Sequence, residues 1–269
     1  MAYKAARWPG VLLLCAGWIL LCACRPENGP AEETITVFAA ASLTDAFSEL
    51  GRSFEAAHTQ YQVRFNFAGS QQLAQQLAQG APADVFASAD ERQMAVAIES
   101  GRVRRDAAQP FAHNELVVVT PAANPAGIDV LQDLAQPGVT LVLAAPLVPA
   151  GQYALEVLRR ASPTFRDEVL ANVVSYEQNV RAVLTKVALG EADAGIVYAS
   201  DVGGAGAAGV HVIQIPPDVN SRATYPIAVV DDSRQPAPAR AFVAFVLSPA
   251  GQERLAAYGF IPVSTPPSE

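Results

Sequence analysis

The feature that most constrains the fold is a regular alternation, from Thr34 onward, of short apolar runs with helical patterns. Apolar or alternating runs of this length predict β-strands, and apolar residues three and four positions apart predict helices. The expected strands are 35–38, 61–67, 83–88, 116–120, 139–144, 173–176, 194–198, 210–215 and 225–230, and the expected helices are 43–50, 71–79, 90–100, 130–134, 149–161, 179–189, 237–247 and 250–258. This order predicts an α/β fold of mostly parallel sheets flanked by helices, with ligands bound beyond the carboxyl ends of the strands.

The first strand-to-helix turn has a sequence suited to an anion. Three alanines, 39–41, follow the first expected strand, and Ser42 then precedes the helical pattern 43–50. A helix start presents unpaired N–H groups and the positive end of the helix dipole, and the alanines leave the backbone open to a ligand. Ser42 with Asp45 three residues on also fits a helix N-cap, an alternative that needs no ligand.

Two further hydroxyls occupy comparable places. Ser70 lies between an expected strand and the helix that follows it, and Tyr198 ends another expected strand. Because ligands collect at the carboxyl ends of the strands, we expect Ser42, Ser70 and Tyr198 to lie near ligand sites. For Tyr198 taken alone, a half-buried packing role is the alternative.

The first 23 residues have the pattern of a signal peptide. Lys4 and Arg7 precede an apolar run, 11–23, that is shorter than a bilayer-spanning helix needs. The run ends at Cys24 in a sequence that resembles a bacterial lipobox, which predicts lipidation of Cys24. Ordinary cleavage or an uncleaved anchor are the alternatives. Residues 24–33 are polar and turn-rich, so we expect a lipid-anchored tether there.

Composition narrows the chemistry of the body that follows. Without Lys4 and Arg7, the 18 basic residues fall to 16 against 26 acidic ones, a net charge near −10. This charge argues against nucleic acid or an anionic membrane surface as a partner. All three cysteines, at positions 15, 22 and 24, precede the body, so we expect no disulfide or thiol chemistry in it. About 240 remaining residues suffice for one large or two ordinary domains.

Nine short motifs occur in an order that resembles one family. They are Thr36-Val-Phe-Ala-Ala-Ala-Ser-Leu-Thr, Phe67-Ala-Gly-Ser, Gly80-Ala-Pro-Ala-Asp-Val-Phe-Ala-Ser-Ala-Asp, Glu115-Leu-Val-Val-Val, Val148-Pro-Ala-Gly-Gln-Tyr, Asn179-Val-Arg, Gly195-Ile-Val-Tyr-Ala-Ser-Asp, Tyr225-Pro-Ile-Ala-Val-Val and Tyr258-Gly-Phe. From Thr34 to Phe260 the chain resembles the substrate-binding lipoproteins of bacterial molybdate and tungstate ABC importers. The resemblance implies a two-lobed periplasmic-binding-protein fold of the second type, whose chain crosses between the lobes twice. We expect lobe I to hold residues 34–113 and 228–266, and lobe II residues 114–227.

The resemblance also implies a ligand site made of neutral hydrogen-bond donors. Molybdate or tungstate would be bound between the lobes by the hydroxyl and N–H groups of Ser42 and Ser70, the N–H groups of Ala150 and Val180, and the phenol of Tyr198. The first four of these residues each begin an expected helix, where neutral donors and helix dipoles balance a dianion. The resemblance implies no cofactor and no direct metal-cation site.

The same resemblance implies the partners and the location. We expect a monomer without enzymatic activity, on the periplasmic or cell-surface face, anchored by lipid on Cys24. It would deliver the oxyanion to the permease and ATPase of an ABC importer. Arg181, the one cationic residue in the motifs, is interpreted as solvated. The family often has serine where this chain has Gly69, which bears on the conformation of the ligand loop.

Other functions fit the sequence less well. A serine hydrolase would need the second glycine of a Gly-x-Ser-x-Gly turn, but Gln72 stands in that place after Gly69-Ser70. Of the three histidines, His58 lies in a polar run that we expect to be exposed, and His113 and His211 have no evident acid partner. The three are scattered and show no metal-ligand spacing. A ligand-free scaffold or adhesin lipoprotein, and the same fold with another tetrahedral oxyanion such as sulfate, remain as alternatives.

Overall fold

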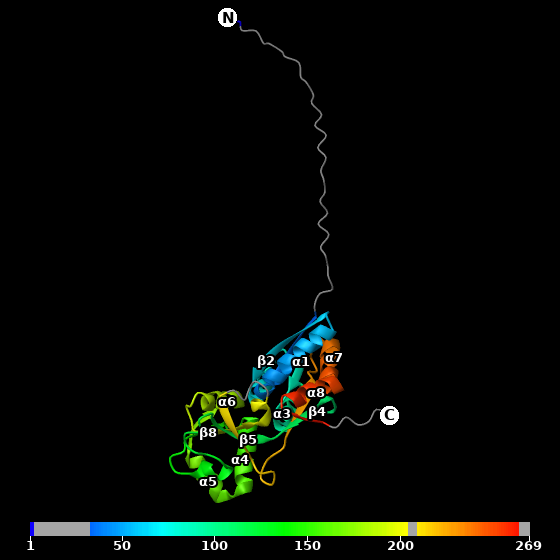
Figure 1. Ribbon diagram of the computed structural model, residues 1–269. Helices are drawn as coiled ribbons and strands as arrows, with labels where there is room; N and C mark the ends of the chain where they lie inside the picture. The colour runs from blue at the N-terminus through cyan, green and yellow to red at the C-terminus, as the bar shows by residue number, and fades with distance from the viewer. Residues whose placement is uncertain (3–32, 204–208, 264–269) are drawn as a thin grey trace. The chain divides into compact units, whose positions relative to one another are not determined.

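The computed structural model describes residues 1–2, 33–203 and 209–263 (Figure 1). Contacts divide the chain into two compact units, Met1–Ala31 and Glu32–Glu269. The expected signal peptide, the tether and Cys24 fall almost wholly outside the described residues. Within the described residues, we find no helix with both the length and the apolar character needed to cross a bilayer. The architecture below is that of the second unit.

A six-stranded sheet and its helices form one half of this unit, which we call lobe I. The strand order is β11-β4-β10-β3-β1-β2, and β1 runs parallel to both of its neighbours. The strands are β1 Glu33–Ala40, β2 Tyr61–Ala68, β3 Val85–Ala87, β4 Gln109–Asn114, β10 Ala223–Val229 and β11 Ile261–Pro262. Successive side chains of a strand point to opposite faces. Accordingly, Ile35 and Val37 enter one apolar core and Phe38 enters another.

Helices cover both faces of this sheet. The core that receives Ile35 is filled by rings from α1 and α7, where Phe54 and Phe242 meet edge to face with ring centroids 5.4 Å apart. The core that receives Phe38 is filled by α2 and α3, through Leu73 and Met94. The helices are α1 Thr44–Ala57, α2 Ser70–Ala78, α3 Glu91–Glu99, α7 Pro236–Leu247 and α8 Pro249–Ala257, with 3-10 turns η1 Ala41–Leu43 and η2 Arg105–Ala107.

A five-stranded sheet organises the other half, lobe II, in the order β7-β6-β8-β5-β9. Its strands are β5 Leu116–Pro121, β6 Leu141–Ala144, β7 Val173–Glu177, β8 Ala194–Tyr198 and β9 Val210–Gln214. Its helices are α4 Pro149–Ala161, α5 Pro163–Ala171 and α6 Val180–Ala188, with 3-10 turns η3 Leu131–Ala135 and η4 Ala199–Val202. The central strands β6 and β8 are buried along their whole length, because α4 and α6 pack on them.

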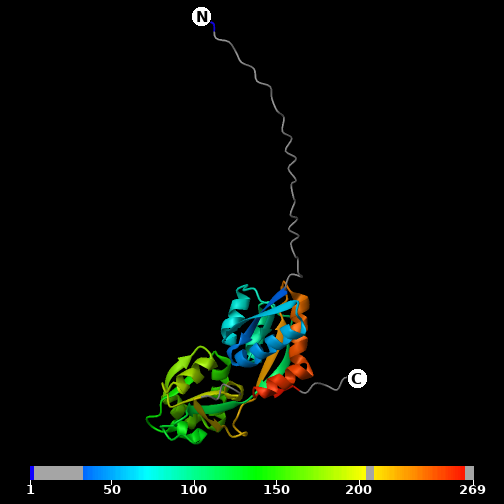
Figure 2. The same cartoon turned by 45° about the horizontal axis from the view of Figure 1, so that its top comes forward.

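Lobe I is assembled from both ends of the unit and lobe II from its middle. In Figures 1 and 2 lobe I carries the blue, cyan and orange-to-red parts of the chain, and lobe II carries the green and yellow parts. Glu115 joins β4 to β5, and residues 215–222 join β9 to β10. We expected the return to lobe I at 227/228, but β10 already belongs to the sheet of lobe I from Ala223.

Both sheets are mixed, where the sequence led us to expect mostly parallel ones. The parallel pairs involve β1 with β2 and β3, and β6 with β7 and β8. The antiparallel pairs are made by β5, β9 and β10, which flank the two crossings between the lobes, and by the last strand, β11. Alternation of strands and helices therefore predicts the parallel cores of the lobes and not the strands at the crossings.

Candidate functional site

Turns at the ends of strands from both lobes enclose one small cavity. Its volume is about 10 Å³. Pockets for organic ligands are typically roughly 300–1,000 Å³, so this one is far too small for such a ligand. All five residues that the sequence singled out line the cavity, namely Ser42, Ser70, Ala150, Val180 and Tyr198. Among the described residues that line it, none carries a charged side chain.

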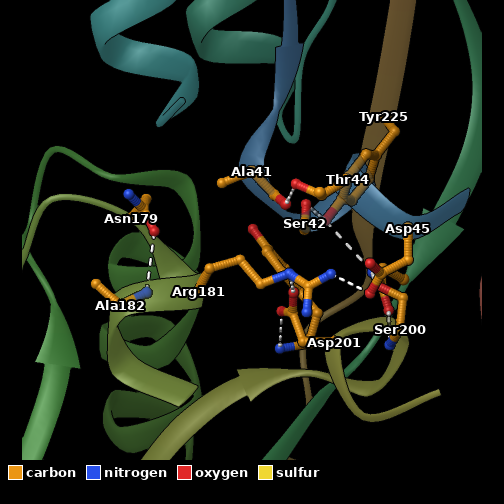
Figure 3. A network of polar contacts seen from close by, with 12 residues as sticks. Ala41, Ser42, Thr44, Asp45, Asn179, Arg181, Ala182, Ser200, Asp201 and Tyr225 are labelled. Atoms are coloured by element: carbon orange, nitrogen blue, oxygen red, sulfur yellow. Dashed lines mark hydrogen bonds and ion pairs between the residues drawn. The ribbon is translucent and has the colours of Figure 1, made fainter. Parts of the chain in front are cut away.

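Ser42 lies in the turn η1 and does not cap a helix. The helix α1 begins at Thr44, no side chain caps it, and Thr44 Oγ1 donates a hydrogen bond to the Ala41 carbonyl at 2.7 Å. Ser42 Oγ instead lies 3.0 Å from the phenol oxygen of Tyr225 (Figure 3). The interpretation of Ser42 as an N-cap is therefore wrong, and its hydroxyl is held beside the cavity.

A chain of hydrogen bonds orients this hydroxyl. Asn114 Nδ2 donates to Tyr225 Oη at 3.3 Å and to Ser200 Oγ at 2.7 Å. Because Tyr225 Oη accepts from an amide that can only donate, the phenol proton is available for Ser42 Oγ. Burial raises the pKa of Tyr225 well above its ordinary value, so the phenol keeps that proton. The proton of Ser42 is then left for a ligand.

Ser70 is oriented by the backbone of its own lobe. It is the first residue of α2, is 1% exposed, and its Oγ accepts a hydrogen bond from the Ala89 N–H at 3.0 Å. The Ala89 N–H occupies a lone pair of Ser70 Oγ and makes no use of the O–H proton. Ser70 can therefore donate this proton into the cavity. As a first-turn residue, Ser70 also has a backbone N–H with no partner inside its helix.

Tyr198 has a hydroxyl that lines the cavity and finds no protein partner among the described residues. It ends β8 and is 1% exposed, and its Oη makes no hydrogen bond within the described part of the chain. Burial raises the pKa of Tyr198 well above its ordinary value, so the phenol remains a donor. A buried hydroxyl left unpaired costs about 1–3 kcal/mol, which a ligand acceptor at this position would relieve.

The remaining two donors are backbone groups at helix starts in lobe II. Ala150 is the second residue of α4, after Pro149, and Val180 is the first residue of α6. Asn179 caps α6 by accepting a hydrogen bond from the Ala182 N–H at 3.0 Å, which leaves the Val180 N–H free for another acceptor. Both helix starts bring the positive ends of their dipoles to the cavity.

Arg181 is held by two carboxylates, so its interpretation as a solvated side chain is wrong. Its guanidinium pairs with Asp45 of lobe I, and its Nε lies 3.6 Å from Asp201 Oδ1 of lobe II (Figure 3). Asp201 Oδ2 accepts a hydrogen bond from the Tyr198 N–H at 3.1 Å. Burial raises the pKa of Asp201 to about 7, against the opposing effect of Arg181. This network lies directly behind the neutral lining of the cavity.

The other hollows that we find along residues 33–203 and 209–263 differ from this cavity. A wider hollow between α3 and the helices α4 and α5 has acidic and basic residues mixed along its wall, among them Asp90, Arg92, Glu156 and Arg159. Within the residues that the structure describes, no three metal-ligating side chains cluster. His58 lies against Phe54, and His113 contacts Thr224, so neither is placed to activate Ser70.

Two α/β lobes with a small donor-lined cavity between them define a solute-binding protein of the extracellular type. The family described as bacterial extracellular solute-binding protein matches the chain over residues 35–261. The chain belongs to this family.

The chain is similar to several solute-binding proteins whose ligands are named. The molybdate-binding protein ModA of Mycobacterium tuberculosis H37Rv is 40% identical over 267 residues, covering 94% of this chain and 98% of that protein. The substrate-binding domain of a putative molybdenum ABC transporter from Clostridium difficile is 30% identical, with a TM-score of 0.65 over 86% of this chain and 99% of that one. The sulfate-binding protein SubI of Mycobacterium tuberculosis is 22% identical, with a TM-score of 0.78 over 86% and 88% of the two chains. This last similarity concerns the fold alone.

Three residues that position the cavity were not found from the sequence. Tyr225 and Ala89 lie within motifs quoted above, but nothing in those motifs indicated a bond to Ser42 or Ser70. Asn114, which lies in the unpredicted strand β4, had no sequence signal at all. These contacts join positions at least 19 apart in the chain, and local patterns do not encode such distances.

Proposed function

We propose that this chain captures molybdate, or tungstate, between its lobes and delivers it to the permease and ATPase of an ABC importer. The observation that carries the proposal is the convergence of five donors on one small, uncharged cavity, where the buried Tyr198 hydroxyl has no partner within the described residues. The identity of 40% with a molybdate-binding protein supports the same ligand. No cofactor enters the proposal, since molybdate is the cargo.

The donor set favours an oxyanion that carries no proton. The backbone N–H groups of Ala150 and Val180 can only donate, and both serine hydroxyls have a partner that leaves their protons for the ligand. At neutral pH molybdate and tungstate are unprotonated tetrahedral dianions. Hydrogen bonds from neutral donors to a charged acceptor contribute about 1.5–3 kcal/mol each, so the site needs no cation in its lining.

Two common anions should fit less well. Phosphate keeps at least one proton at neutral pH, and an O–H turned toward donors would lose its own hydrogen bond at a cost of about 1–3 kcal/mol. Sulfate has no such proton but is smaller, so donors spaced for the larger anion would not all reach it. Sulfate is therefore the alternative cargo and belongs in any test.

A thermal-shift panel of oxyanions tests the cargo. Molybdate and tungstate at ~1,000 times the dissociation constant should add about 4.1 kcal/mol to the free energy of unfolding. For a protein of this size that corresponds to roughly 8–16 °C in Tm. Sulfate should shift Tm far less, and phosphate least. Equal shifts for sulfate or phosphate and molybdate at the same concentration would refute the cargo while leaving the fold intact.

The setting of the protein is part of the proposal. We place it as a monomer on the periplasmic or cell-surface face, held by a lipid on Cys24. We also propose that residues 116–214 move as lobe II against the remainder, with hinges at Glu115 and 215–222. Scattering that shows no contraction when molybdate is added would argue against the hinge.

A further inference from the structure

The start of α6 in lobe II is contacted by lobe I on two sides. On one side, Gln71 Nε2 donates to the backbone carbonyl of Gln178 at 2.9 Å, and Gln72 Nε2 donates to the side-chain carbonyl of the same residue at 2.9 Å. Gln71 and Gln72 lie in the first turn of α2, and Gln178 lies two residues before α6. These bonds exist only while the two lobes are together.

On the other side, Asp45 of α1 pairs with Arg181 of α6 (Figure 3). The side chains of Asp45 and Arg181 are 42% and 25% exposed, so the pair is partly shielded from water. Arg181 also faces Asp201 at 3.6 Å within its own lobe. The guanidinium therefore has a carboxylate neighbour in each lobe.

The backbones of the two lobes approach each other closely at Gly69. A Cβ added at Gly69 would lie 2.6 Å from the Gln178 carbonyl oxygen, which is too near for two atoms that are not bonded. The φ and ψ of Gly69 are −60° and 136°, values that alanine adopts without strain. The obstacle to a side chain at this position is thus the opposite lobe and a flexible glutamine, not the local backbone.

We propose that Asp45, Gln71 and Gln72, together with the space left by Gly69, form a latch that holds the start of α6 against lobe I and sets how long the anion stays bound. The inference rests on the proposed function, because it needs a ligand enclosed between the lobes. The polar latch residues act as positioning residues through Gln178 and Arg181. Contacts that are made only after closure affect the dissociation rate more than the association rate.

Asp45→Asn tests the ionic side of the latch. Release of radiolabelled molybdate into excess unlabelled ligand should be about two- to fivefold faster, the range of a partly exposed ion pair. The matched control is Glu49→Gln, which removes an acid of similar exposure, 39%, that pairs with Arg52 inside α1. The control also removes one negative charge, so it corrects for any general gain in anion association. Equal release rates in the two variants would overturn the ionic latch.

Gln71→Ala tests the hydrogen-bonded side in the same assay. Loss of a neutral hydrogen bond predicts release about two- to tenfold faster. Gln75→Ala, at an exposed position one turn along α2, is the control for shortening a glutamine in that helix. Release at the rate of the control would overturn this half of the latch.

Gly69→Ala tests whether ligand binding needs the close approach of Gly69 to the Gln178 carbonyl. Overpacking at the contact should weaken molybdate affinity by about 5- to 150-fold and reduce the contraction seen by scattering. The Tm without ligand should stay unchanged or rise, because the alanine is locally unstrained. Full contraction and unchanged affinity would overturn the inference. Absence of any oxyanion-induced shift in the unaltered protein would instead refute the proposed function, and the latch with it.

Discussion

The two lobes supply donors to the cavity in different states of readiness. In lobe I, Ser42 and Ser70 each have a protein partner, Tyr225 and the Ala89 N–H, that fixes the hydroxyl before any ligand arrives. In lobe II, the Tyr198 hydroxyl has no partner among the described residues. The comparison teaches that lobe I carries a preorganised half-site, whereas the half-site of lobe II is completed by the ligand.

The two lobes also place different charges beside the network of Arg181. Asp201 lies in lobe II, fully buried beside the Tyr198 N–H, with Arg181 as its nearest cation. In lobe I the charge nearest the network is Asp45, which is partly exposed. Lobe II therefore holds both the unpaired hydroxyl and the buried carboxylate of this network.

The largest expected effect concerns Asp201 and stability. Since burial raises the pKa of Asp201 to about 7, the folded state binds this proton more tightly than the unfolded state. Protonated Asp201 therefore stabilises the folded state. Its contribution to the free energy of unfolding is complete below about pH 4, and it falls by at most about 1.4 kcal/mol per pH unit as the pH rises toward 7. The difference in unfolding free energy between the unaltered protein and Asp201→Asn, followed by denaturant titration from pH 5 to 8, should show this slope. A difference that is constant with pH would contradict the assignment. Asp45 and Arg181 face Asp201 in this range and are present in both proteins.

The next effect concerns Ser70, the preorganised hydroxyl of lobe I. Ser70→Ala removes a donor to the ligand and should reduce molybdate affinity by ~10- to 150-fold. It also leaves the buried Ala89 N–H unpaired, so stability without ligand should fall by about 1–3 kcal/mol. Calorimetric titration and thermal melting measure the two losses. Ser48→Ala, which loses only a bond to the Thr44 carbonyl within α1, is the control.

Tyr198→Phe should lower the molybdate affinity without lowering stability, whereas Ser70→Ala should lower both. Affinity should fall by ~10- to 150-fold, because a donor to a desolvated anion is removed. Stability without ligand should stay the same or rise, because the hydroxyl has no protein partner to lose. Tyr176→Phe, on an edge strand of lobe II and 47% exposed, is the control. If Tyr198→Phe lowered the stability without ligand as much as Ser70→Ala does, the proposed difference between the donors of the two lobes would be wrong.

The smallest effect should come from Tyr225, which orients Ser42 from within lobe I. Tyr225→Phe removes one neutral hydrogen bond, worth about 0.5–1.5 kcal/mol, so affinity should fall only about two- to tenfold. Asn114 keeps its bond to Ser200 in this variant. Tyr61→Phe in β2, whose ring stacks on Phe54, controls for the loss of a phenol in the same lobe. Unchanged molybdate affinity in Tyr225→Phe would mean that Ser42 binds the ligand without being oriented by Tyr225.

The sequence predicted the parallel core of the fold well and its edges poorly. Strands such as β1 and β8 are largely apolar and lead into helical turns, so their patterns are unambiguous. The strand β4 reads Gln-Pro-Phe-Ala-His-Asn and shows no alternation, because it lies where the chain leaves lobe I. The helix α5 follows α4 after a single residue, so its pattern merges with the preceding helix.

The candidate site was predicted by position and not by contact. The resemblance placed Ser42, Ser70, Ala150, Val180 and Tyr198 together, and all five line the cavity, although their binding of a ligand stays a prediction. What could not be predicted was which hydroxyl is paired. The Ser42 to Tyr225 contact spans 183 residues, and no local pattern reports on such a pair.

The route of the chain through the lobes has a consequence for how the protein is made. The sheet of lobe II is complete once residues 116–214 exist, whereas that of lobe I needs β10 and β11, which come last. A ribosome releases the N-terminal strands first, so β1 and β3 wait through the synthesis of residues 88–222 before β10 can pair with β3. Throughout that interval the half of lobe I that holds Ser42 and Ser70 has an unpaired strand edge. Synthesis is thus the period in which this protein is most exposed to misassociation.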